Sequence, residues 1–422
     1  MYVCSYCDGQ HLKWQGRCGE CGKWGTLTEE IAQTSKKSKT QEARSAPLID
    51  LTQASLKTVE YKKTGLEELD RVLSGGIVSG SVLLLAGEPG IGKSTLVAQI
   101  ASSLSGKCLY VSGEESEGQL LMRLERLAVD PKAIIFSNSV EVGSIITAAK
   151  GVKPALVIVD SIQTMIPDDV ENLPGSPHAV RAATAQLIAF AKSTNIPVLL
   201  IGQVTKEGSV AGPKTLEHLV DSVLTIEGEK TTSYRILRAS KNRFGTTDEV
   251  GVFEMTSKGM IAVANPSQKF LEERQPTPGS IVTCVMEGTR PFLVEVQALA
   301  EKSIFANPIR RTSGFDSGRL QMLLAIIGKH TGVKTAGHDV YVNIVGGMKV
   351  KETAVDLAVA LAVISSIQNK TFFADAVVVG ELGLGGEIRS VSFLDRRQKE
   401  AERLGLLKFI SPKDAKNLKN LI

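Results

Sequence analysis

A glycine-rich segment in the first quarter of the chain has the residue types and the spacing of a phosphate-binding loop. It reads Gly87-Glu-Pro-Gly-Ile-Gly-Lys93-Ser94 and matches the pattern G-x-x-x-x-G-K-[ST]. Glycines let backbone N–H groups turn towards a phosphate, the lysine would neutralise the β- and γ-phosphates, and the serine would ligate Mg²⁺. We therefore expect ATP and Mg²⁺ to be held by Gly87, Glu88, Pro89, Gly90, Ile91, Gly92, Lys93, Ser94 and Thr95.

Acidic residues further along the chain could complete a site for hydrolysis. Asp160 ends the apolar run LVIVD, and we expect it to hold Mg²⁺ through water at the carboxyl edge of a sheet. Many phosphate-loop proteins place a glutamate next, but Ser161 stands there. Glu114 and Glu115 follow the run YVSG and are either solvated loop residues or catalytic acids. We favour Glu114 as the base that activates water, with Glu115 assisting.

Four cysteines near the amino terminus have metal-ligand spacing. Cys4, Cys7, Cys18 and Cys21 form C-x2-C-x10-C-x2-C, which lets four thiolates meet at one ion. Zinc is the expected metal, iron is a lesser alternative, and disulfides or free thiols are the remaining readings. The site would be structural, because four protein ligands leave no open position. Basic and aromatic residues in this segment would contact nucleic acid or protein, or the tryptophans would simply cover the metal: Lys13, Trp14, Arg17, Lys23 and Trp24.

The elements that position these residues follow from the hydrophobic pattern between about residues 61 and 264. Apolar runs predict strands at 81–87, 107–113, 133–137, 155–160 and 197–202, and helix-like segments lie between them at 94–104, 117–127, 140–150 and 178–194. Continuous apolar strands that alternate with helices indicate a mostly parallel sheet covered on both faces. Three more strands, at 222–227, 233–240 and 251–255, have hairpin spacing.

The remaining segments set the expected domain organisation. We predict a metal-binding knuckle at 1–30, a polar linker at 31–58, an ATPase domain at 59–269 and a second α/β domain at 270–422. The segment FLEERQPTPGS marks the last boundary, because it combines charges with two prolines. Helices are expected in the second domain at 318–328 and 352–368.

Composition limits the class of protein. The chain has 422 residues, of which 43% are hydrophobic and 22% charged, with a net charge of +4 that neither requires nor excludes a nucleic-acid partner. The longest apolar run, 357–364, has eight residues, whereas a membrane-spanning helix needs about 20. No basic leader followed by an apolar stretch opens the sequence MYVCSYCDG, so we expect a cytoplasmic protein without a membrane partner.

Taken in order, these motifs resemble the bacterial RadA (Sms) family of DNA-repair ATPases. The resemblance rests on the cysteine knuckle, TGLEELDRVLSGGIVSGSVLLLAGEPGIGKST, YVSGEES, LVIVDSIQT, VTKEG, AGPKTLEHLVDSVL and KNRFG at 241–245. It implies a RecA-like motor domain in a hexameric ring. It also implies a helicase-type activity on single-stranded and branched DNA in recombination and repair, alongside the recombinase RecA.

The resemblance also implies roles for residues outside the phosphate loop. Lys241 and Arg243 of KNRFG would reach the γ-phosphate of the neighbouring subunit, or else contact DNA phosphates. Gln203, at the end of the run PVLLIG, would sense the γ-phosphate. The loops at 163–178 and 204–215 would face the pore of the ring, where Lys206 and Lys214 would contact the DNA backbone or remain solvated.

The last third of the chain resembles the proteolytic domain of Lon proteases. By this resemblance the position of the catalytic lysine is Asp395, and the segment 351–355 that should carry the serine has none. A Ser–Lys dyad needs both groups, so we expect an inactive scaffold that serves ring assembly and DNA contact. Its candidate basic contacts, each of which could also be plain solvated surface, are Arg310, Arg311, Arg319, Lys349 and Lys351.

Two other functional classes remain open on the sequence. A nucleotide-gated scaffold, such as the clock ATPases, would share TGLEELDRVLSGG and the paired glutamates. An ATP-dependent protease is disfavoured by Asp395 and by the missing serine.

Overall fold

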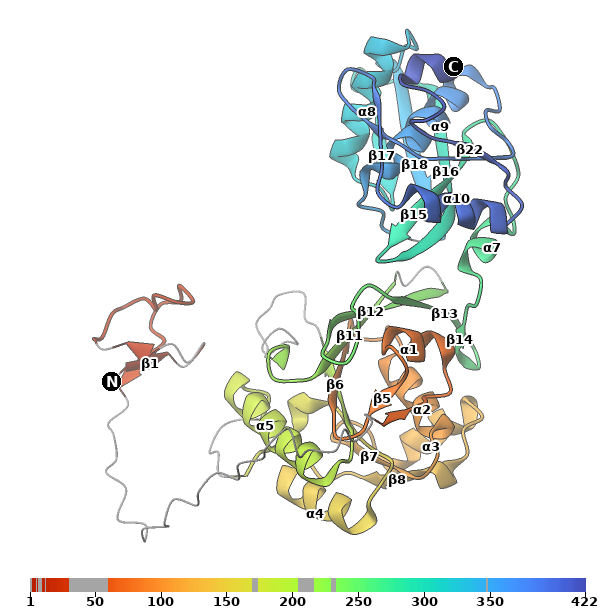
Figure 1. Cartoon of the computed structure of the whole chain (residues 1–422). Coiled ribbons are helices and arrows are strands. Elements are labelled where there is room, and N and C mark those ends of the chain that lie inside the picture. Colours follow the sequence, from red (N-terminus) through yellow and green to blue (C-terminus); the bar gives the residue numbers. More distant parts are fainter. Residues whose placement is uncertain are drawn as a thin grey trace, which may run out of the picture.

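The computed structural model describes residues 2–4, 6, 10–11, 13–29, 60–168, 174–203, 216–228, 233–346 and 348–422. Within these ranges the chain forms a small amino-terminal sheet and two larger α/β units, each built on its own sheet (Figure 1). Among the helices of these ranges, none has the length and the apolar character that a membrane span requires.

The amino-terminal segment forms a three-stranded antiparallel ribbon. β1 (Tyr2–Cys4) lies between β2 (Gln10–His11) and β3 (Leu27–Glu29). Its buried centre contains Cys4, Cys18 and Leu27, with few apolar neighbours. So small an apolar centre contributes little to stability, and a bound metal would contribute most of it.

The second unit is built on a nine-stranded sheet in the order β14-β13-β12-β11-β6-β10-β9-β7-β8. β6 runs parallel to both of its neighbours, and β10, β9, β7 and β8 continue the parallel part. β12, β13 and β14 are antiparallel additions at the other edge. The strands are β6 (Val82–Gly87), β7 (Cys108–Ser112), β8 (Ile134–Ser137), β9 (Leu156–Asp160), β10 (Val198–Gln203), β11 (Ser222–Glu227), β12 (Tyr234–Asn242), β13 (Val250–Thr256) and β14 (Gly259–Ala262).

Helices cover both faces of this sheet because its central strands are apolar on both sides. Leu83 and Leu85 of β6 pack in one hydrophobic cluster with α1, α2 and α3, whereas Val82 and Leu84 pack in a second cluster with α4 and α5. The helices are α1 (Glu67–Val72), α2 (Lys93–Ser103), α3 (Glu117–Arg126), α4 (Val142–Val152) and α5 (Pro177–Thr194). β4 (Tyr61–Lys62) pairs antiparallel with β5 (Ile77–Val78), and α1 lies in the connection between them.

The predicted parallel strands and their helices are confirmed, with ends that agree within two residues. Local signals account for this agreement. α3 begins at a capping box of Ser116 and Gln119, and α5 begins after the cap Ser176 and ends at Asn195, whose φ is 60°. Such caps satisfy the N–H groups that a helix start leaves without partners.

In the described residues from 280 onwards, the third unit has a six-stranded sheet in the order β17-β18-β16-β15-β19-β22, a two-stranded sheet of β20 and β21, and the helices α8, α9 and α10. Its elements are β15 (Ser280–Glu287), β16 (Arg290–Lys302), β17 (Arg310–Ser313), α8 (Ser317–His330), β18 (His338–Ile344), α9 (Asp356–Gln368), β19 (Ala376–Val378), β20 (Glu381–Leu382), β21 (Ile388–Arg389), α10 (Leu394–Arg403) and β22 (Lys408–Ile410). The apolar run 357–364 is buried along its whole length in α9, which is a core helix. The predicted start of this helix at residue 352 is wrong, because residues 353–355 form a 3-10 turn first.

The predicted boundary between residues 269 and 270 falls inside α7 (Pro266–Leu271). Val250 and Val252 of β13 belong to the same hydrophobic cluster as the core of the third unit. Since the two α/β units share buried side chains here, the position of the boundary stays a prediction.

Candidate nucleotide-binding site

The phosphate loop connects the carboxyl end of β6 to the start of α2. Gly90 and Gly92 have φ of 77° and 114°, which side chains rarely adopt. The φ of Gly92 favours glycine at this position, and a Cβ there would also lie 2.3 Å from the flexible end of Met260, which would have to move. Ser94 and Thr95 lie in the first turn of α2, whose N-terminus faces the loop. The structure thus brings together the nine residues that the sequence predicted for nucleotide contact.

Lys93 is folded back over the loop. Its Nζ donates hydrogen bonds to the carbonyl oxygens of Gly87 (2.9 Å) and Glu88 (3.0 Å), and only 7% of the residue is exposed. Burial lowers the pKa of Lys93, and the carboxylates of Asp160 and Glu114 oppose that shift. The ammonium group is therefore held beside the position where the loop would cradle a phosphate.

Asp160 lies at the carboxyl end of β9, two strands from β6 across β10. It is buried, and its Oδ2 accepts a hydrogen bond of 2.7 Å from the hydroxyl of Tyr110 on β7. Burial and the neighbouring Asp160 carboxylate raise the pKa of Tyr110 well above its usual range, so the hydroxyl keeps its proton. Tyr110 thereby fixes the orientation of the carboxylate that we expect to hold Mg²⁺.

Glu114 lies beside the end of β9 although it follows β7. Ser161 donates a hydrogen bond of 2.5 Å from Oγ to Glu114 Oε1. Gln203 Nε2, at the end of β10, is 3.4 Å from both carboxylate oxygens of Glu114. Three strand ends therefore place Glu114, Ser161 and Gln203 in one polar cluster next to Asp160.

Glu115 differs from Glu114 in its surroundings. Its carboxylate forms an ion pair with Arg123 of α3, and both side chains are largely buried. The Arg123 guanidinium therefore occupies one of the carboxylate oxygens that would otherwise be available to water. This contact favours a structural contribution of Glu115 over direct action on water, and the assisting role stays a prediction.

Lys241 and Arg243 lie towards the amino-terminal end of β6, whereas the phosphate loop of the same chain follows the carboxyl end of this strand. Asn242 pairs with Ser222, which pairs with Leu83 near the start of β6, whereas the loop leaves the end of β6. Four residue steps separate Leu83 from Gly87, or about 13 Å along the strand. The cations of KNRFG therefore lie far from their own nucleotide loop.

Both cations contact groups of the segment 217–221, which leads into β11. Arg243 NH1 is 3.7 Å from Asp221 Oδ1, and half of its side chain is exposed. Lys241 Nζ donates to the carbonyl oxygens of Glu217 (2.7 Å) and His218 (3.3 Å). Burial and the charge of Arg243 lower the pKa of Lys241. The sequence predicted the two cations but not Asp221, which lies far from them along the chain.

A cavity of about 630 Å³ opens beside the phosphate loop. Gly87, Glu88 and Ile91 line one side, and Lys349 and Lys351 of the carboxyl-terminal unit line another. The two α/β units therefore share a cavity next to the expected position of the nucleotide.

The cysteine cluster has the geometry of a thiolate metal site. The Sγ atoms of Cys4, Cys18 and Cys21 all lie within 4.8 Å of one another, and Cys7 lies outside the described residues. Cys4 Sγ and Cys21 Sγ are 3.7 Å apart, whereas a disulfide needs about 2.05 Å. His11 Nε2 lies 3.3 Å from Cys18 Sγ, a contact that the sequence did not reveal. These side chains fit a zinc ion bound by thiolates.

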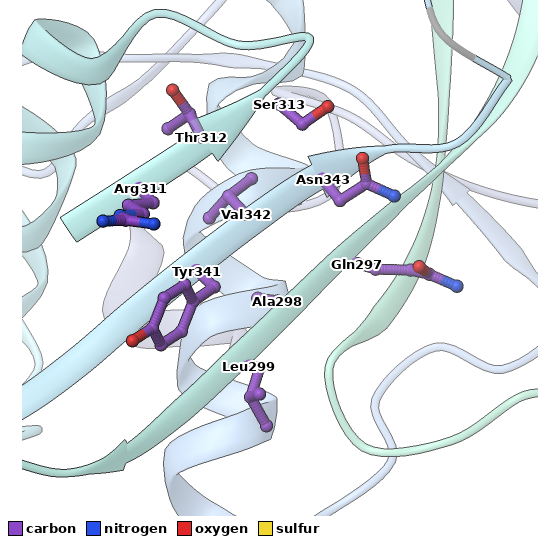
Figure 2. A pocket seen from close by; sticks show the side chains of 9 residues that line it. All are labelled: Gln297, Ala298, Leu299, Arg311, Thr312, Ser313, Tyr341, Val342 and Asn343. Atoms are coloured by element: carbon purple, nitrogen blue, oxygen red, sulfur yellow. The ribbon is translucent and has the colours of Figure 1, made fainter. Parts of the chain in front are cut away.

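The basic residues expected to contact DNA have different positions. Lys206 and Lys214 lie outside the described residues. Arg310 and Arg311 are on β17, and Arg311 lines a hollow on the sheet with Leu299 and Tyr341 (Figure 2). Lys349 is exposed.

Arg319 has an internal role instead. Its guanidinium pairs with the buried carboxylate of Asp356, with 3.1 Å between Nε and Oδ1, and donates to the carbonyl oxygen of Leu382 at 3.2 Å. The interpretation of Arg319 as a DNA contact is not supported by these partners.

Two side chains at the site were missed in the sequence. Tyr110 is indistinguishable from a core residue in its apolar strand, since its partner is 50 positions away. Arg235 of β12 donates from Nε to the carbonyl oxygen of Ile91 in the phosphate loop, at 3.2 Å. Its position inside a strand with alternating burial gave no signal beyond a charge between apolar neighbours.

The fold and the site define a RecA-like P-loop ATPase with an amino-terminal zinc ribbon and a second α/β domain. Family models match the chain as an "AAA domain" at residues 50–209, as a "Rubredoxin metal binding domain" at 2–29 and as "Subunit ChlI of Mg-chelatase" at 320–415. The similarity to known proteins extends over nearly the whole chain. The chain belongs to the RadA family of DNA repair proteins.

Three bacterial relatives illustrate this similarity. The DNA repair protein RadA of Aquifex aeolicus is 45% identical over 414 residues, covering 98% of this chain and 93% of that protein. The RadA proteins of Pseudomonas aeruginosa and Bacillus subtilis are 44% and 42% identical, covering 98% and 97% of this chain and 92% of each relative. Among solved structures, the RadB recombinase is 25% identical with a TM-score of 0.39, covering 48% of this chain and 99% of that chain. A KaiC-like protein from Pyrococcus horikoshii is 18% identical with a TM-score of 0.40, covering 49% and 99%.

Proposed function

We propose that the chain is a DNA-dependent ATPase, a helicase-type motor on single-stranded and branched DNA that promotes branch migration in recombination and repair. The observation that carries this proposal is the cluster at the strand ends, where Lys93, Asp160 and Glu114 converge beside the phosphate loop. Membership of the RadA family supports a role in DNA repair.

Nucleotide binding follows from the loop. Its backbone N–H groups and the N-terminus of α2 would surround the β-phosphate, and Lys93 would leave the carbonyl oxygens of Gly87 and Glu88 to pair with phosphate oxygens. Ser94 and Asp160 would hold Mg²⁺, which neutralises charge on the phosphates when it is bound.

Hydrolysis needs a base and a sensor. Glu114 would accept a proton from the attacking water, with Ser161 fixing one carboxylate oxygen. Gln203 would contact the γ-phosphate from the end of β10 and report its loss to the segment that follows. Glu115 would assist hydrolysis indirectly, through its ion pair with Arg123.

Lys241 and Arg243 would act on the nucleotide of a neighbouring subunit. Their position at the far edge of the sheet supports this, because they are too distant to serve their own loop. A homo-oligomer, which we propose to be a hexameric ring, would bring this edge against the next phosphate loop.

DNA would pass through the pore of the ring, where Lys206 and Lys214 would contact its backbone. Further contacts to DNA phosphates would come from the remaining candidate cations: Lys241, Arg243, Arg310, Arg311 and Lys349. We propose that the protein works in the cytoplasm with the recombinase RecA and that the zinc ribbon binds DNA or a protein partner. The carboxyl-terminal domain would be an inactive scaffold: Asp395 lies on α10, and the Thr353 hydroxyl donates to Glu381.

The deciding experiment measures ATP turnover and strand displacement from a forked duplex, with and without single-stranded oligonucleotide. Stimulation by the oligonucleotide together with displacement supports the motor. Turnover without any stimulation would favour a nucleotide-gated scaffold. Casein degradation that survives Lys93→Ala would instead point to a protease.

A further inference from the structure

The β15–β16 hairpin of the carboxyl-terminal unit contacts the sheet of the ATPase unit. Its tip, residues Glu287–Arg290, is called the hairpin tip below. Thr289 donates from its N–H to the carbonyl oxygen of Asp248 (2.9 Å) and from Oγ1 to Glu249 Oε1 (2.8 Å). A Cβ on Gly288 would lie 1.8 Å from Asp248 O, so the two backbones touch. Residues 248 and 249 follow KNRFG almost directly, so the hairpin tip holds the segment that leaves this motif.

A second contact holds the strand that leads into KNRFG. Glu287 Oε2 is 2.6 Å from Arg238 NH1, and Arg238 also pairs with Glu227 at 3.2 Å. Arg238 lies on β12, three positions before Lys241. The Arg238 and Glu287 side chains are 27% and 16% exposed, so this pair is less screened by water than a surface pair.

A third contact holds the helix beside KNRFG. Arg290 NH1 is 2.6 Å from Glu68 Oε2 on α1, where the Glu68 side chain is 2% exposed. The same oxygen accepts a hydrogen bond of 2.8 Å from the N–H of Val252. Just beyond α1, Ser74 lies so close to Gly245 of KNRFG that a Cβ there would be 2.0 Å from Ser74 Oγ. The hairpin tip therefore contacts the strand before KNRFG, the segment after it and the helix beside it.

β12 also reaches the phosphate loop of its own chain. Arg235 donates to Ile91, Arg238 lies midway along the strand, and Lys241 lies at the other edge of the sheet. β12 thus connects the phosphate loop of its own subunit to the cations that would act on the nucleotide of the next subunit. The hairpin tip contacts β12 at Arg238, midway between the two.

We propose that Glu287 and the rest of the hairpin tip are positioning elements that hold β12 and KNRFG, so that Lys241 and Arg243 are presented to the neighbouring nucleotide. The inference deepens the proposed function and rests on the proposed action of Arg243 across the interface. It assigns the carboxyl-terminal domain a part in ATP turnover even though that domain supplies no residue of the phosphate loop.

The test uses the full chain with Glu287→Gln, Arg238→Gln and the double variant. Because a small displacement of a catalytic group can cost up to about 100-fold, each single variant should lower DNA-stimulated turnover by about tenfold, with ATP affinity changed less than about twofold. The double variant should be no worse than Arg238→Gln alone, because that substitution already removes the contact with Glu287 as well as the one with Glu227. Glu387→Gln is the matched control, because it removes an exposed ion pair with Arg389 elsewhere in the same domain and should leave turnover unchanged.

Mixing subunits separates positioning from general damage. Asp160→Ala subunits carry an intact hairpin tip and Arg243, so they should restore turnover at the intact sites of neighbouring Glu287→Gln subunits. Unchanged turnover in Glu287→Gln, or a loss that mixing does not restore, overturns the inference. If Arg243→Ala itself leaves turnover unchanged, the action across the interface fails and the inference fails with it.

Discussion

The Ser161 hydroxyl and the Glu114 carboxylate are joined by a hydrogen bond of 2.5 Å, although 47 positions separate them in the chain. Many P-loop ATPases carry the base on the strand that ends in the Mg²⁺-binding aspartate. Here that position is a serine, and the carboxylate beside it belongs to Glu114, which follows the neighbouring strand β7. On the proposed mechanism, the two residues would together provide what a single glutamate provides elsewhere, a carboxylate at a fixed place beside Asp160.

Replacing Lys93 should remove nucleotide chemistry without unfolding the protein. Lys93→Ala deletes the ammonium that would pair with the phosphates, so turnover should fall about 100-fold or more and nucleotide binding should weaken. Turnover and retention of a fluorescent ATP analogue measure this, with circular dichroism as the test of folding. Lys107→Ala, an exposed lysine before β7, is the matched control. Normal ATPase in Lys93→Ala would remove the phosphate-loop assignment.

The two adjacent glutamates should behave differently. Glu114→Gln keeps the shape but removes the base, so turnover should fall by about 100-fold or more while ATP still binds. Glu115→Gln mainly weakens the ion pair with Arg123, so its effect should be several-fold smaller and accompanied by a lower melting temperature. Single-turnover hydrolysis and thermal melting distinguish the two. Equal losses in both variants would contradict the assignment of the base to Glu114.

Arg243→Ala should lower turnover and spare ATP binding, because the guanidinium lies at the sheet edge remote from its own loop. Arginine residues that act on a neighbour's γ-phosphate contribute about 1,000-fold or more to turnover. Mixing Arg243→Ala with Asp160→Ala subunits should restore part of the activity, since each supplies what the other lacks. No recovery across a series of mixing ratios would leave Arg243 without a role between subunits.

Zinc removal should affect partner binding more than basal ATPase. The thiols of Cys4, Cys18 and Cys21 form their own small core, separate in sequence from the phosphate loop. Metal analysis should find about one zinc per chain, and Cys18→Ser should lower that content. Binding to oligonucleotides or to RecA should then weaken while DNA-free turnover is retained. A full zinc content in Cys18→Ser would contradict the thiolate site.

Alkaline pH should destabilise the ATPase domain through Cys108. Burial raises the pKa of this thiol from 9.0 to about 12. Between these values the unfolded chain releases the proton and the folded chain keeps it, so stability is full below pH 9 and falls as pH rises towards 12. The expected slope is about 1.4 kcal/mol per pH unit for one thiol. Denaturant unfolding at pH 8 to 11 measures it, and Cys108→Ala should have a shallower slope by that amount. Equal slopes in the two proteins would show that the thiol does not titrate as described.

The parts of the fold that the sequence predicted best depend on local patterns. An apolar run encodes the strand from Val82 to Gly87. The glycines that follow can adopt the positive φ that the loop requires, and Lys93 marks the start of the helix. The same is true of Asp160, because a parallel strand delivers its last residue to the edge where the loop lies.

The parts that escaped prediction are pairings between distant residues. Periodicity says which face of an element is buried, but it does not say which side chain of another element lies opposite. Tyr110 looked like a core residue, Arg319 looked like a surface cation, and the partners Asp160 and Asp356 became apparent only in three dimensions. The start of α9 was misplaced for a related reason, since no capping side chain marks it.

The position of Arg243 at the sheet edge away from Lys93 has a consequence for how such a protein is switched on. On the proposed arrangement, a single chain would bind ATP but hydrolyse it very slowly, because its Arg243 acts only on the nucleotide of a neighbouring subunit. ATP turnover would then increase more than linearly with protein concentration. A high local concentration of subunits at a DNA junction would therefore start ATP hydrolysis without a separate activator.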